Sequence, residues 1–160
     1  MQRICIARAL ASDPKLIVLD EPLSSLDVSV QAQILNLLQD LKEELEVSYL
    51  LISHDLEAVY YLSDSIYVMY GGRIMESIED IELFYNMKHP YTMKLLSSSP
   101  EYRMKNTVED IEEISSDDEN ALGLGCPYAN RCPKAIDKCF KDRPKIKEIE
   151  VNHKIACHLF

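Results

Sequence analysis

A pair of adjacent carboxylates follows a short run of aliphatic residues. The stretch LIVLDEP, residues 16–22, places Asp20 and Glu21 directly after that run. A carboxylate at the C-terminal end of a parallel strand lies where open α/β sheets bind their ligands. There Asp20 could hold Mg²⁺, directly or through water, and Glu21 could orient or deprotonate an attacking water. The alternative is that the pair only caps a helix.

A histidine follows a second apolar run. The stretch SYLLIS, residues 48–53, is followed by His54 and Asp55. In a parallel sheet the two runs end at the same edge, which predicts that His54 lies toward Glu21. Two carboxylates and a histidine at one sheet edge are a plausible hydrolase constellation. A lone histidine at a strand end is also common as a structural residue.

Cysteines form the second group of residues whose side chains could do chemistry. Four of the five fall within the C-terminal part of the chain, separated by five, six and seventeen residues: Cys126, Cys132, Cys139 and Cys157. Four thiolates suit tetrahedral zinc or an iron–sulfur cluster. The CxxC pairs of zinc ribbons are missing, so spacing leaves zinc, iron–sulfur and plain reduced thiols open. His153 and His158 are alternative ligands, and Cys5 is expected to be a small buried residue of the first helix.

The hydrophobic pattern predicts the elements that position these groups. Helical spacing and short aliphatic runs alternate along the first half of the chain, and Gly71-Gly72 indicate a hairpin turn. The pattern predicts an α/β fold whose sheet is parallel in its core and carries a hairpin at its edge. The expected helices cover residues 3–12, 27–46 and 55–63, and the expected strands cover 16–19, 48–53, 65–70 and 73–78.

Composition limits the functions that fit. The chain has 160 residues, of which 17 are basic and 27 acidic, giving a formal net charge of -10. Such a balance disfavours nucleic acid, whose phosphates need clustered Lys and Arg. No apolar run approaches the roughly 20 residues that span a bilayer, and no signal peptide is recognisable. We therefore expect a cytoplasmic protein that could dock on a membrane complex.

Composition also divides the chain into segments. Residues 1–78 carry the alternating elements, and residues 79–120 contain two short helices and an acidic linker that ends in EDIEEISSDDEN. Residues 121–160 carry the cysteine cluster. Only four glycines occur, and no GxxxxGK[ST] string is present to cradle a phosphate.

Four motifs in order resemble the second half of an ATP-binding-cassette (ABC) nucleotide-binding domain, which has a P-loop NTPase-like sheet. LIVLDEP resembles the Walker B strand with the catalytic glutamate, and SSLD, residues 24–27, resembles the D-loop. LLISHD resembles the histidine switch strand, and QRICIARAL resembles the helix after the LSGGQ signature. The resemblance implies an ATPase that uses Mg-ATP.

The resemblance assigns a role to each matching residue. Asp20 would serve the Mg²⁺ of Mg-ATP, Glu21 would polarise the hydrolytic water, and His54 would sense the γ-phosphate. Ser25 and Asp27 would couple two ATP sites across a dimer. The family's Walker A loop, Q-loop and signature precede the part that this chain matches, so we expect negligible ATPase activity from the chain alone.

The C-terminal half resembles a narrower group. HPYTMKLL, residues 89–96, and the tail that starts at GCPYANRCP are similar to oligopeptide and dipeptide importer ATPases. Some of these carry a 4Fe–4S cluster on these cysteines, which favours iron–sulfur over zinc. The resemblance implies a homologous ATPase, two permease subunits and, indirectly, an extracellular peptide-binding protein as partners. It places the chain on the inner face of the cell membrane.

Three alternatives remain beside a peptide-importer ATPase. Nickel importers belong to the same wider group. The chain could be a non-enzymatic, metal-stapled interaction remnant of such a subunit. A soluble cassette ATPase of translation or DNA repair is a third class, against which the acidic balance and the importer-like tail argue.

Overall fold

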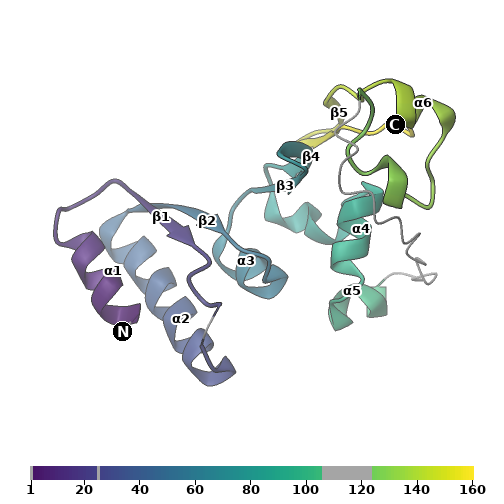
Figure 1. Cartoon of the computed structure of the whole chain (residues 1–160). Coiled ribbons are helices and arrows are strands. Elements are labelled where there is room, and N and C mark those ends of the chain that lie inside the picture. The colour runs from purple at the N-terminus through teal and green to yellow at the C-terminus, as the bar shows by residue number, and fades with distance from the viewer. Residues whose placement is uncertain (1, 25, 106–123) are drawn as a thin grey trace. The chain divides into compact units, whose positions relative to one another are not determined.

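The chain packs into two compact units, Met1–Ser63 and Asp64–Phe160 (Figure 1). The computed structural model describes residues 2–24, 26–105 and 124–160. Ser25 and the acidic stretch 109–120 therefore lie outside the described residues. In the described ranges, no helix combines the length and the apolar character that crossing a membrane requires.

The first unit is a helix-covered parallel strand pair. It consists of α1 (Gln2–Leu10), β1 (Leu16–Asp20), α2 (Val28–Leu45), β2 (Ser48–Ile52) and α3 (Leu56–Leu62). The two strands are parallel, with Leu16 opposite Ser48 and Asp20 opposite Ile52. The α/β alternation predicted from the sequence is therefore confirmed in this unit.

The core of the first unit lies on one face of the strand pair. Ile17 and Leu19 of β1 pack with Ile34 and Leu38 of α2, because strand residues two apart share a face. The α1 helix contributes Ile6 to the same core. Cys5 is exposed, so the expectation that it is buried is wrong. Its place on the helix turns it away from that core.

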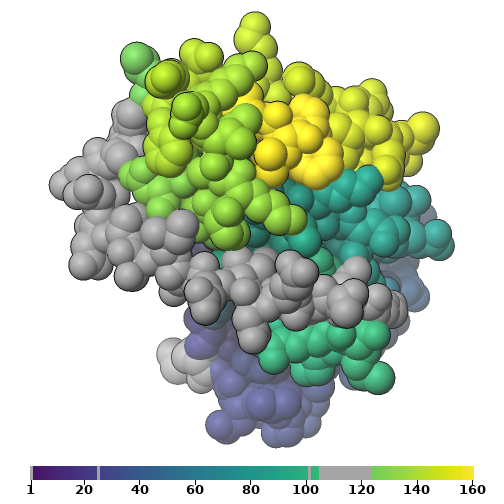
Figure 2. Space-filling model, turned by 90° about the vertical axis from the view of Figure 1, so that its right-hand side faces the viewer, coloured from purple at the N-terminus to yellow at the C-terminus, as the bar shows by residue number. Residues whose placement is uncertain are grey.

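The second unit combines an antiparallel sheet with short helices. Its elements are β3 (Ile66–Tyr70), β4 (Arg73–Ile78), the 3₁₀ helix η1 (Ile81–Asn86), α4 (Pro90–Leu96), α5 (Pro100–Lys105), the 3₁₀ helix η2 (Ala129–Arg131), α6 (Asp137–Lys141), β5 (Lys147–Glu150) and β6 (His153–Ile155). The sheet order is β3-β4-β6-β5. In Figure 2 the yellow C-terminal residues lie against both the green and the teal segments of this unit.

The predicted hairpin forms but belongs to a different sheet than expected. Gly71 and Gly72 have φ values of 54° and 72°, which join β3 to β4 in a tight turn. The expectation that this hairpin lies at the edge of the parallel sheet is wrong for the described residues. Instead β4 pairs with β6, with Ile78 opposite His153. Backbone groups of β4 are satisfied by a strand from the chain's C-terminal end.

Candidate functional site

The structure brings Glu21 and His54 together at the end of the parallel strand pair. Glu21 directly follows β1 and His54 lies two residues beyond the end of β2, so the parallel register places both at one sheet edge. The Nδ1 atom of His54 lies 2.9 Å from Oε1 of Glu21. The His54 side chain is 80% exposed and that of Glu21 38%, so the pair is open to solvent and to a ligand.

The backbone around Glu21 fixes the direction of its side chain. Its φ of 44° lies in the left-handed region, and its N–H donates to the carbonyl oxygen of Ile52 at 2.9 Å. Two glutamine amides hold the loop that follows. Gln2 Nε2 donates to the Pro22 carbonyl at 2.7 Å, and Gln31 Nε2 donates to the Leu23 carbonyl at 3.1 Å.

The other predicted residues of this site lie on the same strand and loop. Asp20 ends β1 with an exposed side chain opposite Ile52. Asp27 is exposed at the start of α2, where its backbone carbonyl accepts from Val30 and Gln31. Asp20 is therefore available to a cation beside the Glu21–His54 pair.

The charge of His54 responds to Glu21. The hydrogen bond and the negative charge of Glu21 raise the pKa of His54, because both favour the imidazolium. The adjacent Asp55 adds a smaller effect in the same direction. The site can thus hold a protonated histidine against a carboxylate, two groups that suit contacts with phosphate and with water.

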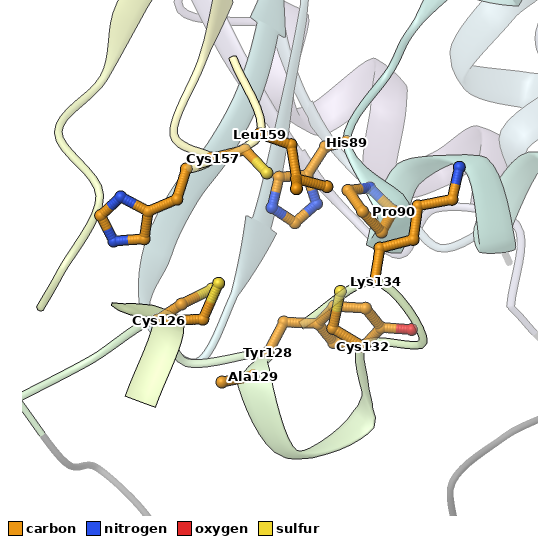
Figure 3. A pocket seen from close by; sticks show the side chains of 11 residues that line it. His89, Pro90, Cys126, Tyr128, Ala129, Cys132, Lys134, Cys157 and Leu159 are labelled. Atoms are coloured by element: carbon orange, nitrogen blue, oxygen red, sulfur yellow. The ribbon is translucent and has the colours of Figure 1, made fainter. Parts of the chain in front are cut away.

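The four C-terminal cysteines line one small cavity in the second unit. Its volume is about 10 Å³, and His89, Tyr128 and His158 also line it. The sulfur atoms of Cys126, Cys132 and Cys157 face the same space (Figure 3). A backbone hydrogen bond of 2.7 Å from the Cys126 N–H to the Cys139 carbonyl joins two of the four positions. The fold thus gathers residues that are up to 31 positions apart, from 126 to 157.

Burial disfavours the thiolate form of three of these cysteines. It raises the pKa of Cys126, Cys132 and Cys157, and negative charge on neighbouring cysteines raises each further. A metal ion would reverse that preference, because a cation stabilises thiolates. Four thiols are the kind of donor that zinc and iron–sulfur clusters take. Among the described residues no group of three or more ligands stands in a metal-holding arrangement, so binding requires the sulfurs to draw together.

A buried carboxylate that no sequence pattern predicted connects β4 and β6 to the start of α4. Glu76 on β4 is fully buried and accepts from the backbone N–H groups of Lys88 and His89, at 2.6 and 3.0 Å. Its Oε1 also lies 2.7 Å from Nε2 of His153. His153 is therefore committed to Glu76 and is not at the cysteine cavity.

His89 is a cavity residue that sequence reasoning missed. It precedes α4, where its Nδ1 accepts from the Tyr91 N–H at 3.1 Å. Burial lowers its pKa to about 4, although the charge of Glu76 acts in the opposite direction. Tyr91 also packs against Tyr128, with ring centroids 5.2 Å apart. The α4 helix and the segment from Cys126 to Cys132 therefore share a core.

The chain is similar to known proteins along nearly its whole length. A sequence model described as the oligopeptide/dipeptide transporter C-terminal region matches residues 75–139. The oligopeptide transport ATP-binding protein AppF of Bacillus subtilis is 44% identical over 162 residues, 99% of this chain and 49% of AppF. OppF of Haemophilus influenzae is 42% identical over 159 residues, 98% of this chain and 48% of OppF.

The chain thus spans about half the length of the curated relatives it matches. The identity extends across both compact units, since only a residue or two of the chain falls outside the alignments. Residues 75–139 match the oligopeptide/dipeptide transporter C-terminal region, and nearly the full length of the chain is similar to about half of each oligopeptide transport ATP-binding protein.

Proposed function

We propose that this chain is the Walker B half of the ATP-hydrolysing subunit of an ABC importer for peptides. The observation that carries the proposal is the 2.9 Å contact of Glu21 with His54 at the end of a parallel strand pair. Asp20 lies one residue away with an exposed carboxylate. The names of AppF and OppF, oligopeptide transport ATP-binding proteins, favour peptide over nickel as the transported substrate.

Each residue has a role that its position supports. Asp20 would hold the Mg²⁺ of Mg-ATP, which supplies charge neutralisation on the phosphates. Glu21 would orient the attacking water and take its proton, and a protonated His54 would hydrogen-bond the γ-phosphate. Asp27 and Ser25 belong to the segment that would face a second ATPase subunit. Phosphoryl transfer needs positioning and charge more than covalent chemistry, which this set provides.

Steady-state ATP hydrolysis tests the proposal. The chain alone should show negligible turnover, whereas its complex with the unmatched half of AppF should hydrolyse ATP with Mg²⁺. Glu21→Gln should then lower kcat by about 100-fold or more, the scale of general-base catalysis. The matched control is Glu57→Gln, an exposed carboxylate on α3, which should retain full activity.

Two results would contradict this function. Turnover by the chain alone that disappears in Glu21→Gln would show that no further half is needed. A complex that binds ATP but does not hydrolyse it would favour the non-enzymatic interaction remnant. The expected partners, a homologous ATPase and two permease subunits on the inner membrane face, are tested by recovery of the chain with permeases from solubilised membranes.

We also propose that Cys126, Cys132, Cys139 and Cys157 bind a 4Fe–4S cluster, with zinc as the alternative. The convergence of their side chains on one cavity supports this. Anaerobic purification followed by iron, sulfide and zinc analysis identifies the group, and Cys132→Ser should abolish its retention. Cys5→Ser is the matched control, because Cys5 lies in the other unit. A well-folded protein without either metal would contradict both assignments.

A further inference from the structure

The second unit contains a larger cavity beside the one that the cysteines line. Its volume is about 510 Å³, within the roughly 300–1,000 Å³ that is usual for small-molecule sites. Residues of η1, α4 and α5, the end of β5 and the C-terminal residues surround it. Most of its lining is apolar or aromatic: Tyr85, Met87, Met93, Tyr102, Leu159 and Phe160. No residue of the candidate ATP site lines this cavity, so the proposed ATPase function leaves it without a role.

Two lysines and one carboxylate lie among these apolar side chains. Lys88 donates a hydrogen bond to Glu150, and both residues line the cavity. That hydrogen bond and the charge of Lys88 lower the pKa of Glu150, so its carboxylate stays charged at neutral pH. Lys134 is the other cation, and among the residues that the structure describes its ammonium forms no ion pair. The lining therefore offers one uncompensated positive charge next to an apolar surface.

The end of the Lys134 side chain faces away from the cysteines. Lys134 follows Cys132 by two residues, and it lines both cavities together with Pro90. In Figure 3 its side chain extends past Pro90, and its nitrogen lies away from the cysteine sulfur atoms. Lys134 is also exposed, so an anionic group can reach its ammonium from solvent.

These groups favour a small ligand with one carboxylate and one large apolar side chain. The formal net charge of -10 disfavours ligands with several negative charges, such as nucleotides. Screening limits the reach of each charge to about 8 Å at physiological salt, so Lys134 can still attract a single carboxylate. A fatty acid would cover Asn86 and Glu150 without offering them a hydrogen bond, which is unfavourable. A short peptide offers a carboxylate, an ammonium and amide groups.

We propose that this cavity binds a short peptide through the carboxylate and the apolar side chain of its C-terminal residue. The carboxylate contacts Lys134, the apolar side chain packs against Tyr85 and Phe160, and the ammonium of the peptide donates to Glu150. The choice of a peptide as ligand rests on the proposed function. The second unit of an importer ATPase would then bind transported cargo on the side of the membrane to which it is delivered.

Isothermal titration calorimetry of the whole chain, purified anaerobically, tests the proposal. Alanyl-phenylalanine should bind with a Kd below about 1 mM. Alanyl-phenylalaninamide lacks the carboxylate, and alanyl-alanine lacks the large apolar side chain. Each should bind at least about tenfold more weakly. The titration contains no nucleotide and no partner protein, so its result does not depend on ATP hydrolysis.

Two pairs of variants test the residues. Lys134→Met should weaken binding of alanyl-phenylalanine about tenfold and should abolish the preference for the carboxylate over the amide. Its matched control is Lys138→Met, an exposed lysine of α6 that does not line the cavity. Phe160→Ala should weaken binding at least about fivefold. Its control is Phe140→Ala, because Phe140 is 52% exposed, close to the 42% of Phe160, and lies outside the cavity.

Three results would overturn the proposal. One is the absence of binding up to about 10 mM peptide. Another is equal binding of the peptide and its amide, or a preference that persists in Lys134→Met. The last is octanoate or ATP binding more tightly than alanyl-phenylalanine and being weakened by Phe160→Ala, which would assign the cavity to another class of ligand. Peptide binding by a chain whose complex does not hydrolyse ATP would overturn the proposed ATPase function and support the peptide site.

Discussion

Glu21 adopts a left-handed backbone conformation at the bend that directly follows β1. Its φ of 44° costs a residue with a side chain about 1–2 kcal/mol. Asp13, Glu46 and Asn152 also have positive φ, but they lie beyond α1, at the C-cap of α2 and in the β5–β6 turn, where the chain must change direction. Strain held at the end of a strand beside His54 is typical of functional positions.

The first prediction concerns the titration of His54. Glu21 raises the His54 pKa above its ordinary value of 6.5, so the ion pair persists below the raised pKa and is lost as pH rises through it. Glu21→Gln should move the pKa down toward 6.5. Two-dimensional NMR of the imidazole measures both values. Glu57→Gln serves as the control, and an unchanged His54 pKa in Glu21→Gln would show that the two side chains do not interact in solution.

The second prediction concerns the buried Glu76. It accepts hydrogen bonds from the N–H groups of Lys88 and His89 and pairs with His153, all away from water. Glu76→Gln removes the charge and faces an amide NH₂ toward one of these donors. The free energy of unfolding should fall by about 3 kcal/mol, as for other broken buried pairs. Urea unfolding followed by tyrosine near-ultraviolet circular dichroism measures this.

An exposed carboxylate provides the comparison for Glu76. Glu79 accepts from Lys154 at 2.6 Å on the surface of the same unit. Water screens that pair, so Glu79→Gln should leave the urea midpoint nearly unchanged. Equal shifts of the urea midpoint in Glu76→Gln and Glu79→Gln would mean that the buried pair contributes no more to the stability of the second unit than the exposed pair does.

The third prediction concerns the pH dependence of stability. His89 titrates at a pKa of about 4 in the folded protein, below its unfolded value of 6.5. Between these values the unfolded chain binds a proton that the folded chain does not, so stability falls as pH falls from about 6.5 to about 4. The loss reaches at most about 3 kcal/mol at 1.36 kcal/mol per pKa unit.

A matched pair of histidine variants isolates this contribution. His89→Asn keeps an acceptor for the Tyr91 N–H and removes the titration, so urea midpoints at pH 7 and pH 4.5 should differ less than in the unsubstituted protein. His158→Asn, at a half-buried position away from Tyr91, should keep the original pH dependence. Identical pH dependence in His89→Asn and the unsubstituted chain would exclude His89 as the cause.

At the scale of elements, local patterns predicted the helices and strands of residues 1–78 well. The aliphatic runs became β1 and β2, and Gly71-Gly72 became the hairpin turn. The proximity of Glu21 and His54 followed from the parallel order of two strand ends. These features depend on residues close in sequence, or on a general rule of sheet topology.

Pairing between distant segments could not be read from the sequence. The β4–β6 ladder joins Ile78 to His153, and no local pattern signals a partner that far along the chain. The burial of Glu76 and the position of His89 both depend on that ladder and on α4. A glutamate in a strand ordinarily predicts that its side chain faces solvent. Glu76 is buried instead, where the backbone N–H groups of residues 88 and 89 donate hydrogen bonds to it, and no sequence pattern marks such donors.

The fourth prediction concerns the close approach of the cysteine segment to α6. A Cβ at Gly125 would lie 2.3 Å from the carbonyl oxygen of Cys139, so Gly125→Ala must displace backbone. The Cys126–Cys139 backbone hydrogen bond should break, and stability should fall by about 2 kcal/mol. Retention of the metal group proposed above should fall with it, and urea unfolding together with metal analysis measures both effects.

A second glycine separates this clash from backbone strain. Gly72 has a φ of 72° and open space around its Cα, so Gly72→Ala introduces strain without a clash. Gly72→Ala should lower the free energy of unfolding by about 1 kcal/mol and should not change retention of the proposed metal group. Loss of metal in Gly72→Ala but not in Gly125→Ala would show that the α6 contact does not organise the cysteines.

At the scale of the whole molecule, length and charge define what the chain can do. Its relatives are about twice as long, and the chain supplies one carboxylate-bearing strand end but no GxxxxGK[ST] string. The function proposed above requires assembly with other polypeptides, which makes the choice of partner class the central question. Net charge distinguishes two classes of binding partner, which are proteins at a membrane and nucleic acids.

The fifth prediction is that the chain does not bind nucleic acid. Phosphate binding requires clustered cations, yet 27 acidic residues outnumber 17 basic ones, and a formal net charge of -10 repels a polyanion. Fluorescence anisotropy with duplex DNA and with single-stranded RNA should show no binding at about 50 mM salt, where electrostatic attraction is strong. A basic nucleic-acid-binding protein validates the probes. Binding that weakens steeply with salt would instead favour a cassette ATPase of translation or DNA repair, because its salt dependence would reveal contacts to phosphates.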